Sequence, residues 1–400
     1  MLTPEQWESL ADGIVNLYDE LNAFLVRDIV RRLVNTEVLT ATALYEIEMM
    51  MQAGQLRQAI IKEVARLSKI SEKDVAQLFE DAAVESLALD DSIYRAAGLK
   101  PLPIKQSPAL FQSLLAGIKK TNGVLYNLTM TTANAAQTSY IKACNTAYFQ
   151  VSTGAVSYAE AIRRQLRELA DTGAEVLYPS GHTDKLDVAV RRSVVTGVAQ
   201  TTGAISEMRA QDMGCDLMEI TAHAGARPSH AEWQGKVVSL SGRAGYLSKA
   251  DIGYGTGPGF KGYNCRHDWY PFYEGISERV YSPDNLEKLN EKSVEYNGKK
   301  YTAYEASQIQ RGFERGIRNA KNSLLAIDAA TKGTTDGALK DTLIQDFGEV
   351  SARLSEHQLR LAELIDKTGF KQDYSRTEVV GFGRSIAQRA VRAARKALGG

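Results

Sequence analysis

The sequence is poor in cysteine and proline. Its 400 residues include three cysteines, Cys144, Cys215 and Cys265, and nine prolines. An odd number of cysteines at scattered spacing does not form a disulfide framework, so we expect free thiols and a reducing compartment. Proline interrupts helices, and its usage here is below the average of about 5%. The low content of cysteine and proline favours a helix-rich chain over one that is stabilised by disulfide bonds.

The sequence also lacks net charge and long apolar runs. Lysine plus arginine and aspartate plus glutamate number 48 each, so no overall field draws the chain to nucleic acid or lipid, and any such attraction must be local. No apolar stretch reaches the roughly 18 residues of a membrane-spanning helix. The first residues also lack the basic and apolar regions of a signal peptide. We therefore expect neither export nor contact with a membrane.

What the sequence has in abundance is helical periodicity. Thr3, Pro4 and Gln6 form a capping box with proline at the first helical position, and apolar residues follow at helical spacing as far as Ile29. A comparable signature at Ser71 opens another helix. Such patterns predict helices over residues 3–29, 40–66, 71–98, 107–151, 157–169, 185–208, 303–324, 339–367 and 384–398.

Residues 214–302 break this periodicity. Two short runs, 216–222 and 235–240, have the length of strands, and Asn297-Gly298 marks a tight hairpin over residues 294–301. We therefore predict a predominantly α-helical fold with a small central α+β segment of short antiparallel strands and a hairpin.

The length predicts two or three domains at roughly 100–200 residues each. Pro101 and Pro103 interrupt the first helical stretch, and the change of character at Gly214 gives a second boundary. The regions that we predict are an N-terminal helical region (1–100), a second helical region (107–213), a mixed α+β domain (214–302) and a C-terminal helical region with a basic end (303–400).

Histidine and cysteine gather in the mixed domain. His223, His230, Cys265 and His267 fall within one 45-residue window. Imidazole and thiolate are zinc ligands, and a closed zinc site needs four of them. The spacing is unlike that of known zinc motifs, because no Cys-x-x-Cys pair is present and Cys265 and His267 alternate as on opposite faces of a strand. We therefore predict no bound metal, with these four residues as the candidate ligands should one bind.

Cys265 could instead be a nucleophile, with Arg266 lowering the pKa of its thiol and a histidine acting as base. Ser229 beside His230 offers a similar pair. Either arrangement needs a third group that orients the base, and spacing in sequence cannot place one. A buried, inert cysteine is the commoner case.

Residues 257–262 match the pattern Gly-x-Gly-x-x-Gly. The dinucleotide-binding fingerprint requires a strand before it and a helix after it, whereas Pro258 interrupts this run and no helical pattern follows. We reject a nucleotide site and predict that the glycines make a flexible or tightly turning surface loop: Gly253, Gly255, Gly257, Gly259 and Gly262. The aromatic run 269–273 is interpreted as core packing.

The last predicted helix carries cations without an intervening acid. At helical spacing they form a positive surface that could contact phosphates or an acidic protein, although the helix dipole also favours cations at a C-terminus. The residues concerned are Arg384, Arg389, Arg392, Arg395 and Lys396.

Two runs in the mixed domain resemble the phage minor capsid protein 2 family. The first is residues 222–235, and the second is residues 262–267 with the aromatic run that follows. Residues 178–181 and 301–305 add to the likeness. We call the residues that carry it the His/Cys motif: His223, Arg227, His230, Trp233, Gly235, Asn264, Cys265, Arg266 and His267.

This resemblance implies a structural protein of a tailed bacteriophage or prophage, made alongside portal and major capsid proteins. The implied location is the virion, with the host cytoplasm as the place of assembly. The implied partners are the portal protein and other capsid proteins of an oligomeric assembly, and packaged DNA could meet the basic C-terminal helix. The motif is also similar to that of phage head-morphogenesis proteins. The resemblance carries over no catalytic residue and no cofactor.

Two functions remain open from the sequence. The first is a non-enzymatic capsid component acting in head assembly or at the portal vertex. The second is a metal-dependent hydrolase or transferase built around His223, His230, Cys265 and His267. We favour the first, with part of the His/Cys motif forming a buried hydrogen-bond network that ties loop to sheet. The network that we predict consists of His223, His230, Asn264, Arg266 and His267.

Overall fold

The fold was analysed in a computed structural model that describes residues 1–35, 42–172 and 174–397. Most of these residues are helical, as the sequence predicts. The helices are α1 (Pro4–Ser9), α2 (Asp12–Asn35), α3 (Thr42–Ala96), α4 (Pro108–Ser152), α5 (Tyr158–Thr172), α6 (Leu186–Asp212), α7 (Pro228–Ala231), α8 (Pro283–Leu289), α9 (Ala303–Gly333), α10 (Gly337–Thr368) and α11 (Arg384–Ala397). No helix in the described part of the chain combines the length and the apolar character that crossing a bilayer requires.

The strands form small sheets. The largest has the order β5-β4-β3-β6, with β3 (Leu217–Ile220) antiparallel to both β4 (Val237–Ser239) and β6 (Trp269–Pro271). The short β5 (Leu247–Ser248) pairs with β4 in parallel, which the prediction of antiparallel strands did not include. Two hairpins complete the set: β1 (Glu175–Leu177) with β2 (Thr183–Lys185), and β7 (Val294–Tyr296) with β8 (Lys299–Tyr301).

The described residues group into two compact units, each made of three separate stretches of chain. Unit 1 comprises Met1–Ile14, Ile70–Leu125 and Val190–Gln308, and unit 2 comprises Val15–Lys69, Tyr126–Ala189 and Ile309–Gly400. Both units therefore combine residues from more than one of the four regions drawn from sequence. Those regions stay a prediction of domain organisation.

The capping signal at the N-terminus is confirmed, but the helix it opens is short. The Thr3 hydroxyl accepts from the Gln6 amide at 3.3 Å, and the Gln6 side chain accepts from the Thr3 amide at 2.7 Å. The prediction of one helix over residues 3–29 is wrong, because α1 ends at Ser9 and α2 begins at Asp12. Aspartate and glycine at positions 12 and 13 lower the helix propensity there.

The start predicted at Ser71 is also wrong, because α3 continues without a break from Thr42 to Ala96. Ser71 is buried within it, and so are Leu67 and Val75 one turn to either side. No proline occurs in α3, its glycine at position 54 is far from Ser71, and the buried face continues at helical spacing. A capping signature is therefore overridden where tertiary burial continues. The predicted start near residue 40 lies outside the described residues.

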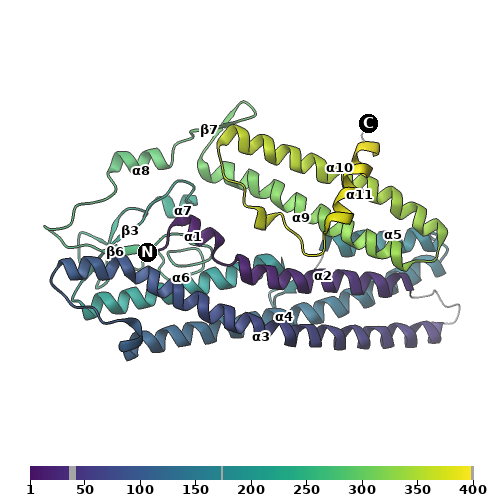
Figure 1. Cartoon of the computed structure of the whole chain (residues 1–400), viewed down its shortest axis with the longest axis horizontal. Helices are drawn as coiled ribbons and strands as arrows, with labels where there is room; N and C mark the ends of the chain where they lie inside the picture. The colour runs from purple at the N-terminus through teal and green to yellow at the C-terminus, as the bar shows by residue number, and fades with distance from the viewer. Residues whose placement is uncertain (36–41, 173, 398–400) are drawn as a thin grey trace. The chain divides into compact units, whose positions relative to one another are not determined.

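The core of unit 1 surrounds the β5-β4-β3-β6 sheet. Figure 1 shows α1 and α7 near β3 and β6 in this unit. The aromatic run is confirmed as core, since Trp269 is 1% exposed and packs against Tyr254 and Phe260 with ring centroids 5.0 and 4.9 Å away. Large aromatic rings fill this layer because they bury much apolar area per residue.

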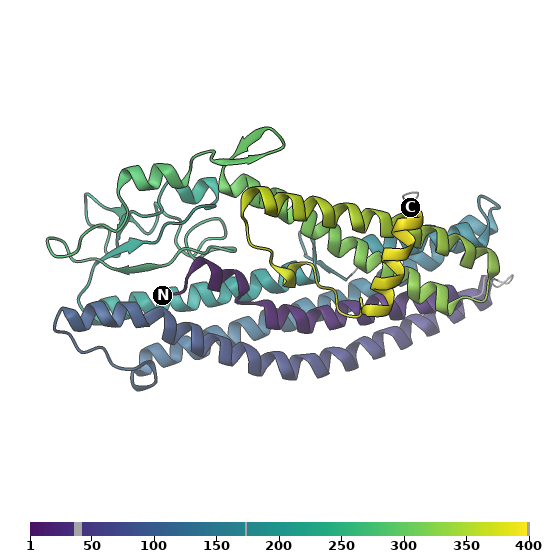
Figure 2. The ribbon, with the colours of Figure 1, turned by 45° about the horizontal axis from the view of Figure 1, so that its top comes forward.

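Unit 2 is built from packed helices. In Figures 1 and 2, α9 and α10 run side by side, and α11 lies across α10. The α10 helix begins at the cap Asp336, whose side chain accepts from the Leu339 amide, and it ends at Gly369 with a left-handed φ of 69°. The buried face of α11 consists of Ile386, Ala390 and Ala394. The two alanines allow α10 and α11 to approach closely.

Candidate functional site

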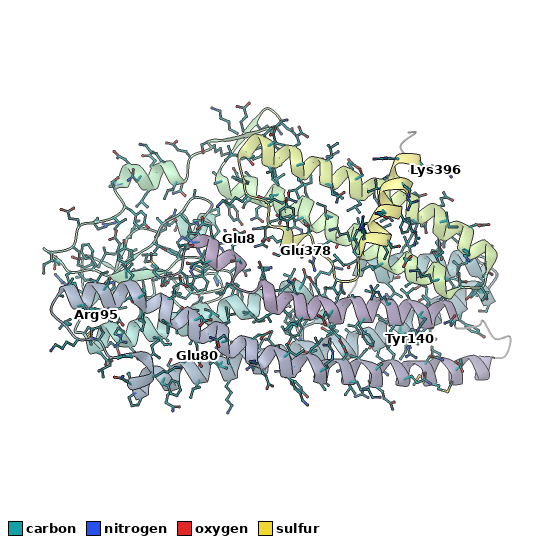
Figure 3. All side chains as sticks on the ribbon, viewed as in Figure 1. Glu8, Glu80, Arg95, Tyr140, Glu378 and Lys396 are labelled. Carbon is teal, nitrogen blue, oxygen red and sulfur yellow. The ribbon has the colours of Figure 1, made fainter. Side chains whose placement is uncertain are left out.

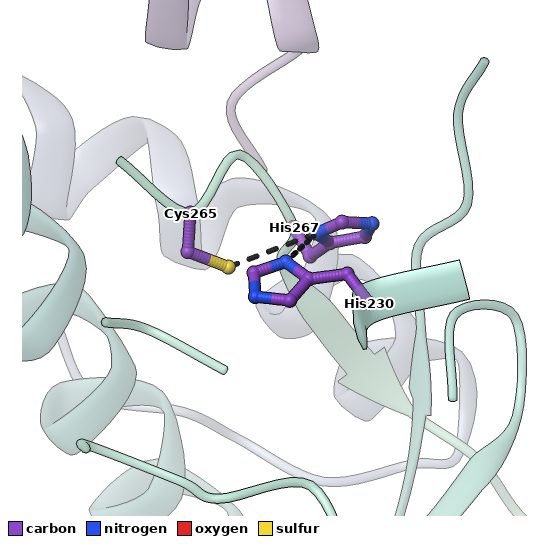
Figure 4. A group of neighbouring side chains, drawn as sticks. All are labelled: His230, Cys265 and His267. Carbon is purple, nitrogen blue, oxygen red and sulfur yellow. Dashed lines mark hydrogen bonds between the residues drawn. The ribbon is translucent and has the colours of Figure 1, made fainter. Parts of the chain in front are cut away.

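Three side chains of the His/Cys motif converge inside unit 1. His230 lies on α7, which begins with Pro228 at its first position, and Cys265 and His267 lie just before β6. Figure 4 shows the two imidazoles and the thiol pointing toward one another. All three are buried, with 1 or 2% of each residue exposed. The expectation that Cys265 and His267 point to opposite faces is wrong, because residues 265–268 form no regular strand.

The distances within this His230/Cys265/His267 cluster are short. The two Nδ1 atoms of His230 and His267 lie 3.4 Å apart, and Cys265 Sγ lies 3.7 Å from His267 Nδ1. One ligand atom from each residue can be chosen so that all three lie within 4.8 Å of one another. Cys265 follows Asn264, whose φ of 52° gives the left-handed turn that brings the thiol inward.

Both histidine rings donate a hydrogen bond to a neighbouring carbonyl oxygen. His230 Nε2 donates to the backbone oxygen of Pro258 at 2.8 Å, and His267 Nε2 donates to Oε1 of Gln234 at 3.2 Å. The same Gln234 oxygen accepts from the His223 amide at 3.1 Å, which identifies it as an oxygen. A carbonyl oxygen can only accept, so both imidazoles carry their proton on Nε2. In each neutral ring Nδ1 then carries no proton and presents a lone pair as an acceptor.

Burial keeps the cluster uncharged at neutral pH. Desolvation lowers the pKa of His230 to about 4 and lowers the pKa of His267 well below its usual range. The same cause raises the pKa of the Cys265 thiol. An activated nucleophile needs the opposite shift and access to a substrate. The environment of Cys265 is therefore that of a structural or metal-binding thiol, and Ser229 beside His230 points to the surface.

Other members of the motif contact the chain segments around the cluster. Arg227 Nη2 donates to the Tyr263 carbonyl at 2.6 Å. The Trp233 ring lies 4.5 Å from the His230 ring and 4.9 Å from the His267 ring, measured between centroids. Gly235 has a φ of 66°, and a Cβ there would lie 2.6 Å from the Leu286 side chain.

Three residues of the predicted network, His223, Asn264 and Arg266, lie outside the cluster. Asn264 is exposed, and Arg266 reaches Glu8 on α1 at 3.4 Å. Glu8 is labelled in Figure 3. Sequence reasoning missed Gln234, which links the His223 backbone to the His267 ring. A glutamine in a helical turn carries no sequence signal for such a role.

The glycine-rich run 257–262 only partly forms the predicted surface loop. Phe260 and Lys261 within it are fully buried, and a Cβ on Gly259 would lie 2.1 Å from the Gly253 carbonyl oxygen. A Cβ on Gly262 would lie equally close to the Thr256 carbonyl oxygen. Glycine is needed here because two backbone segments pack against each other. The prediction of a tight turn is correct. Its placement on the surface holds for Gly255 and Pro258, which are exposed, and is wrong for residues 259–262, which are buried.

Lys261 belongs to a cluster of buried charged residues that the sequence analysis did not predict. Its ammonium donates to Asp268 Oδ1 at 2.6 Å, and neither side chain is more than 2% exposed. Asp90 on α3 faces the same region and accepts from the Ser206 hydroxyl at 2.6 Å. Desolvation, with a smaller repulsion from Asp268, raises the pKa of Asp90 to about 7. We call Lys261, Asp268 and Asp90 the buried charge cluster.

The predicted basic surface belongs to α11 in unit 2. Arg389 is turned inward, where it pairs with Asp328 and lies 4.7 Å above the Phe347 ring. The other four cations are exposed, and Figure 3 labels Lys396 near the end of the helix. They are Arg384, Arg392, Arg395 and Lys396.

Comparison with known proteins now defines the class. The model of the family Phage minor capsid protein 2 matches residues 2–366, and the chain belongs to this family. The chain is 25% identical over 341 residues to a structural protein of Lactococcus phage LL-H, which covers 82% of this chain and 86% of the phage protein. It is also 27% identical over 135 residues to a structural protein of Lactococcus phage mv4, covering 34% and 92% of the two chains. No solved structure shows a significant match to this chain.

The family assignment confirms the resemblance drawn from the His/Cys motif. It makes this chain a phage structural protein of the minor capsid class, for which the virion is the expected location and other capsid components are the expected contacts.

Proposed function

We propose that this chain is a non-catalytic component of the phage head that acts in head assembly or at the portal vertex. The observation that carries this proposal is the family match over nearly the whole length of the chain. Two features of the structure support it. The His230/Cys265/His267 cluster is buried and its groups contact one another, so it offers a substrate no access. Large apolar side chains are also exposed on unit 2, as an assembly subunit requires.

Three of these exposed side chains lie on helices near the C-terminus. Ile344 and Leu359 on α10 are 60 and 71% exposed, and Val391 on α11 is 53% exposed. A subunit of an assembly can bury such residues against a neighbouring subunit, which removes their apolar surface from water. We propose the portal protein or another capsid protein as that neighbour.

The location can be tested on particles of the phage or prophage that encodes the chain. We expect an epitope-tagged chain to copurify with heads and immunogold label to mark one vertex of each head. Deleting its gene should give malformed or unfilled heads while tails form normally. Label on tails, or normal heads filled with DNA after the deletion, would contradict the proposal.

The α11 helix gives a finer expectation. We propose that its exposed cations contact packaged DNA or an acidic surface of the portal protein. The double variant Arg392→Glu/Arg395→Glu should weaken DNA binding and lower the slope of log affinity against log salt by about 2, because two phosphate contacts are lost. Electrophoretic mobility shifts over a salt series measure both effects, and pull-down with the portal protein measures the alternative contact.

The matched control reverses two exposed lysines on β8 in unit 1. Lys299→Glu/Lys300→Glu makes the same change in net charge and should leave both measurements near wild type. Equal behaviour of the two double variants would show that α11 is not a specific contact.

A further inference from the structure

The His230/Cys265/His267 cluster holds more acceptors than protons. His230 Nδ1 and His267 Nδ1 are both bare lone pairs, because each Nε2 donates its proton to a carbonyl oxygen. They nevertheless face each other at 3.4 Å. The Cys265 thiol can donate one proton, which would satisfy His267 Nδ1 at 3.7 Å. The lone pair of His230 is then left opposite another nitrogen in a buried site.

Such an arrangement is costly unless something positive lies between the groups. Buried polar atoms in folded proteins are almost always paired. A cation bound by all three groups at once would satisfy both nitrogens and the sulfur.

Two of the three ligand separations match those of a tetrahedral zinc site, and all three ligand atoms lie within 4.8 Å of one another. Zinc binds imidazole nitrogen at about 2.0–2.1 Å and thiolate sulfur at about 2.3 Å. At the tetrahedral angle these bond lengths separate two nitrogens by about 3.3 Å and a nitrogen from a sulfur by about 3.6 Å. The corresponding separations here are 3.4 and 3.7 Å. The carbonyl partners of the two Nε2 atoms are also the outer contacts that orient histidine ligands around a metal.

We propose that His230, Cys265 and His267 bind a structural Zn²⁺ through Nδ1, Sγ and Nδ1. Cys265 binds as the thiolate and releases its proton to solvent. His223 lies beside the site, with its ring centroid 4.5 Å from that of His267, but it does not belong to the group of three close ligand atoms. The ion would join α7 to the segment before β6 and so lock the His/Cys motif into one shape. This site is independent of where in the virion the chain acts.

The first test is the metal content of the full-length chain. Protein purified without chelator from cells grown with added zinc should carry one zinc per chain by elemental analysis. Cys265→Ser should lose most of that zinc. The control is Cys215→Ser, a buried cysteine of the same hydrophobic core that lies outside the cluster, and it should keep one equivalent.

The second test needs no variant and so does not depend on whether Cys265→Ser folds. Removal of the metal from the wild type by a chelator should lower the Tm by several degrees, and added zinc should restore it. Co²⁺ added to the metal-free chain should give the thiolate charge-transfer band and the intense visible bands of a tetrahedral site. Wild-type protein that holds no stoichiometric metal, gives no such cobalt spectrum and melts identically with zinc or chelator would overturn the proposal.

Discussion

Lys261→Met is expected to destabilise unit 1 by about 3–5 kcal/mol. The Lys261 side chain is fully buried and pairs with Asp268, which is 2% exposed. Removing the ammonium leaves a carboxylate in a site from which water is excluded, and breaking a buried pair on one side has a cost of this size. The ammonium also lies 5.4 Å from the Trp7 ring centroid and 5.5 Å from that of Phe260, so the variant loses two cation–π contacts.

Tryptophan fluorescence during urea unfolding measures this effect in unit 1 alone. The chain has three tryptophans, Trp7, Trp233 and Trp269, and all of them belong to that unit. The signal therefore reports the unit that contains Lys261, even if unit 2 unfolds separately.

Two further variants distinguish loss of the pair from loss of packing. In Lys261→Met/Asp268→Asn no charge is left unpaired, so the double variant should recover part of the lost stability. Lys249→Met removes a similar contact with Glu207, but the two side chains are 37 and 15% exposed, so we expect a loss of about 0–1 kcal/mol. Equal losses for Lys249→Met and Lys261→Met would contradict the importance of burial.

The second large effect is the contribution of Asp90 to the pH dependence of unfolding. Its pKa in the folded chain is about 7, whereas an aspartate in an unfolded chain has a pKa of about 3.9. The folded state therefore keeps the proton that the unfolded state loses as the pH rises from about 4 to about 7. The contribution of Asp90 to the free energy of unfolding should fall across this window by up to about 4 kcal/mol and should level off above it. The buried histidines, whose lowered pKa values act in the opposite direction, are common to the wild type and to an Asp90 variant, so their effect cancels when the two are compared.

Asp90→Asn removes the titrating proton and keeps an acceptor for the Ser206 hydroxyl. We expect the difference in unfolding free energy between this variant and the wild type to grow in favour of the variant from pH 4 to pH 7. Urea unfolding followed by tryptophan fluorescence across that range measures it. Asp74→Asn, at an exposed position of the same helix, should follow the wild-type pH profile. A constant difference between Asp90→Asn and the wild type would show that Asp90 is ionised throughout.

Local signals predicted much of the secondary structure. The Asn297-Gly298 hairpin is confirmed, with φ values of 50 and 71° at the two turn residues. The predicted strand over 216–222 appears as β3, and the helix predicted over 107–151 appears as α4. These elements are set by turn chemistry and hydrophobic period, which act within a few residues. The error at Leu10 occurs where the aspartate and glycine that follow lower the helix propensity, and the error at Ser71 occurs where burial outweighs a capping signature.

The sequence by itself determined that this chain is rich in helices, that a small mixed segment carries the His/Cys motif, and that the motif resembles the minor capsid class. These follow from periodicity, turn residues and the identity of nearby side chains. The tertiary structure alone decided that Cys265 and His267 meet His230, that Gln234 orients one of these rings, and that Lys261 is buried opposite Asp268 and Asp90. The physical reason is that hydrogen bonding, charge pairing and desolvation depend on distance in space, and residues 90, 230 and 265 are brought together only when the whole of unit 1 packs.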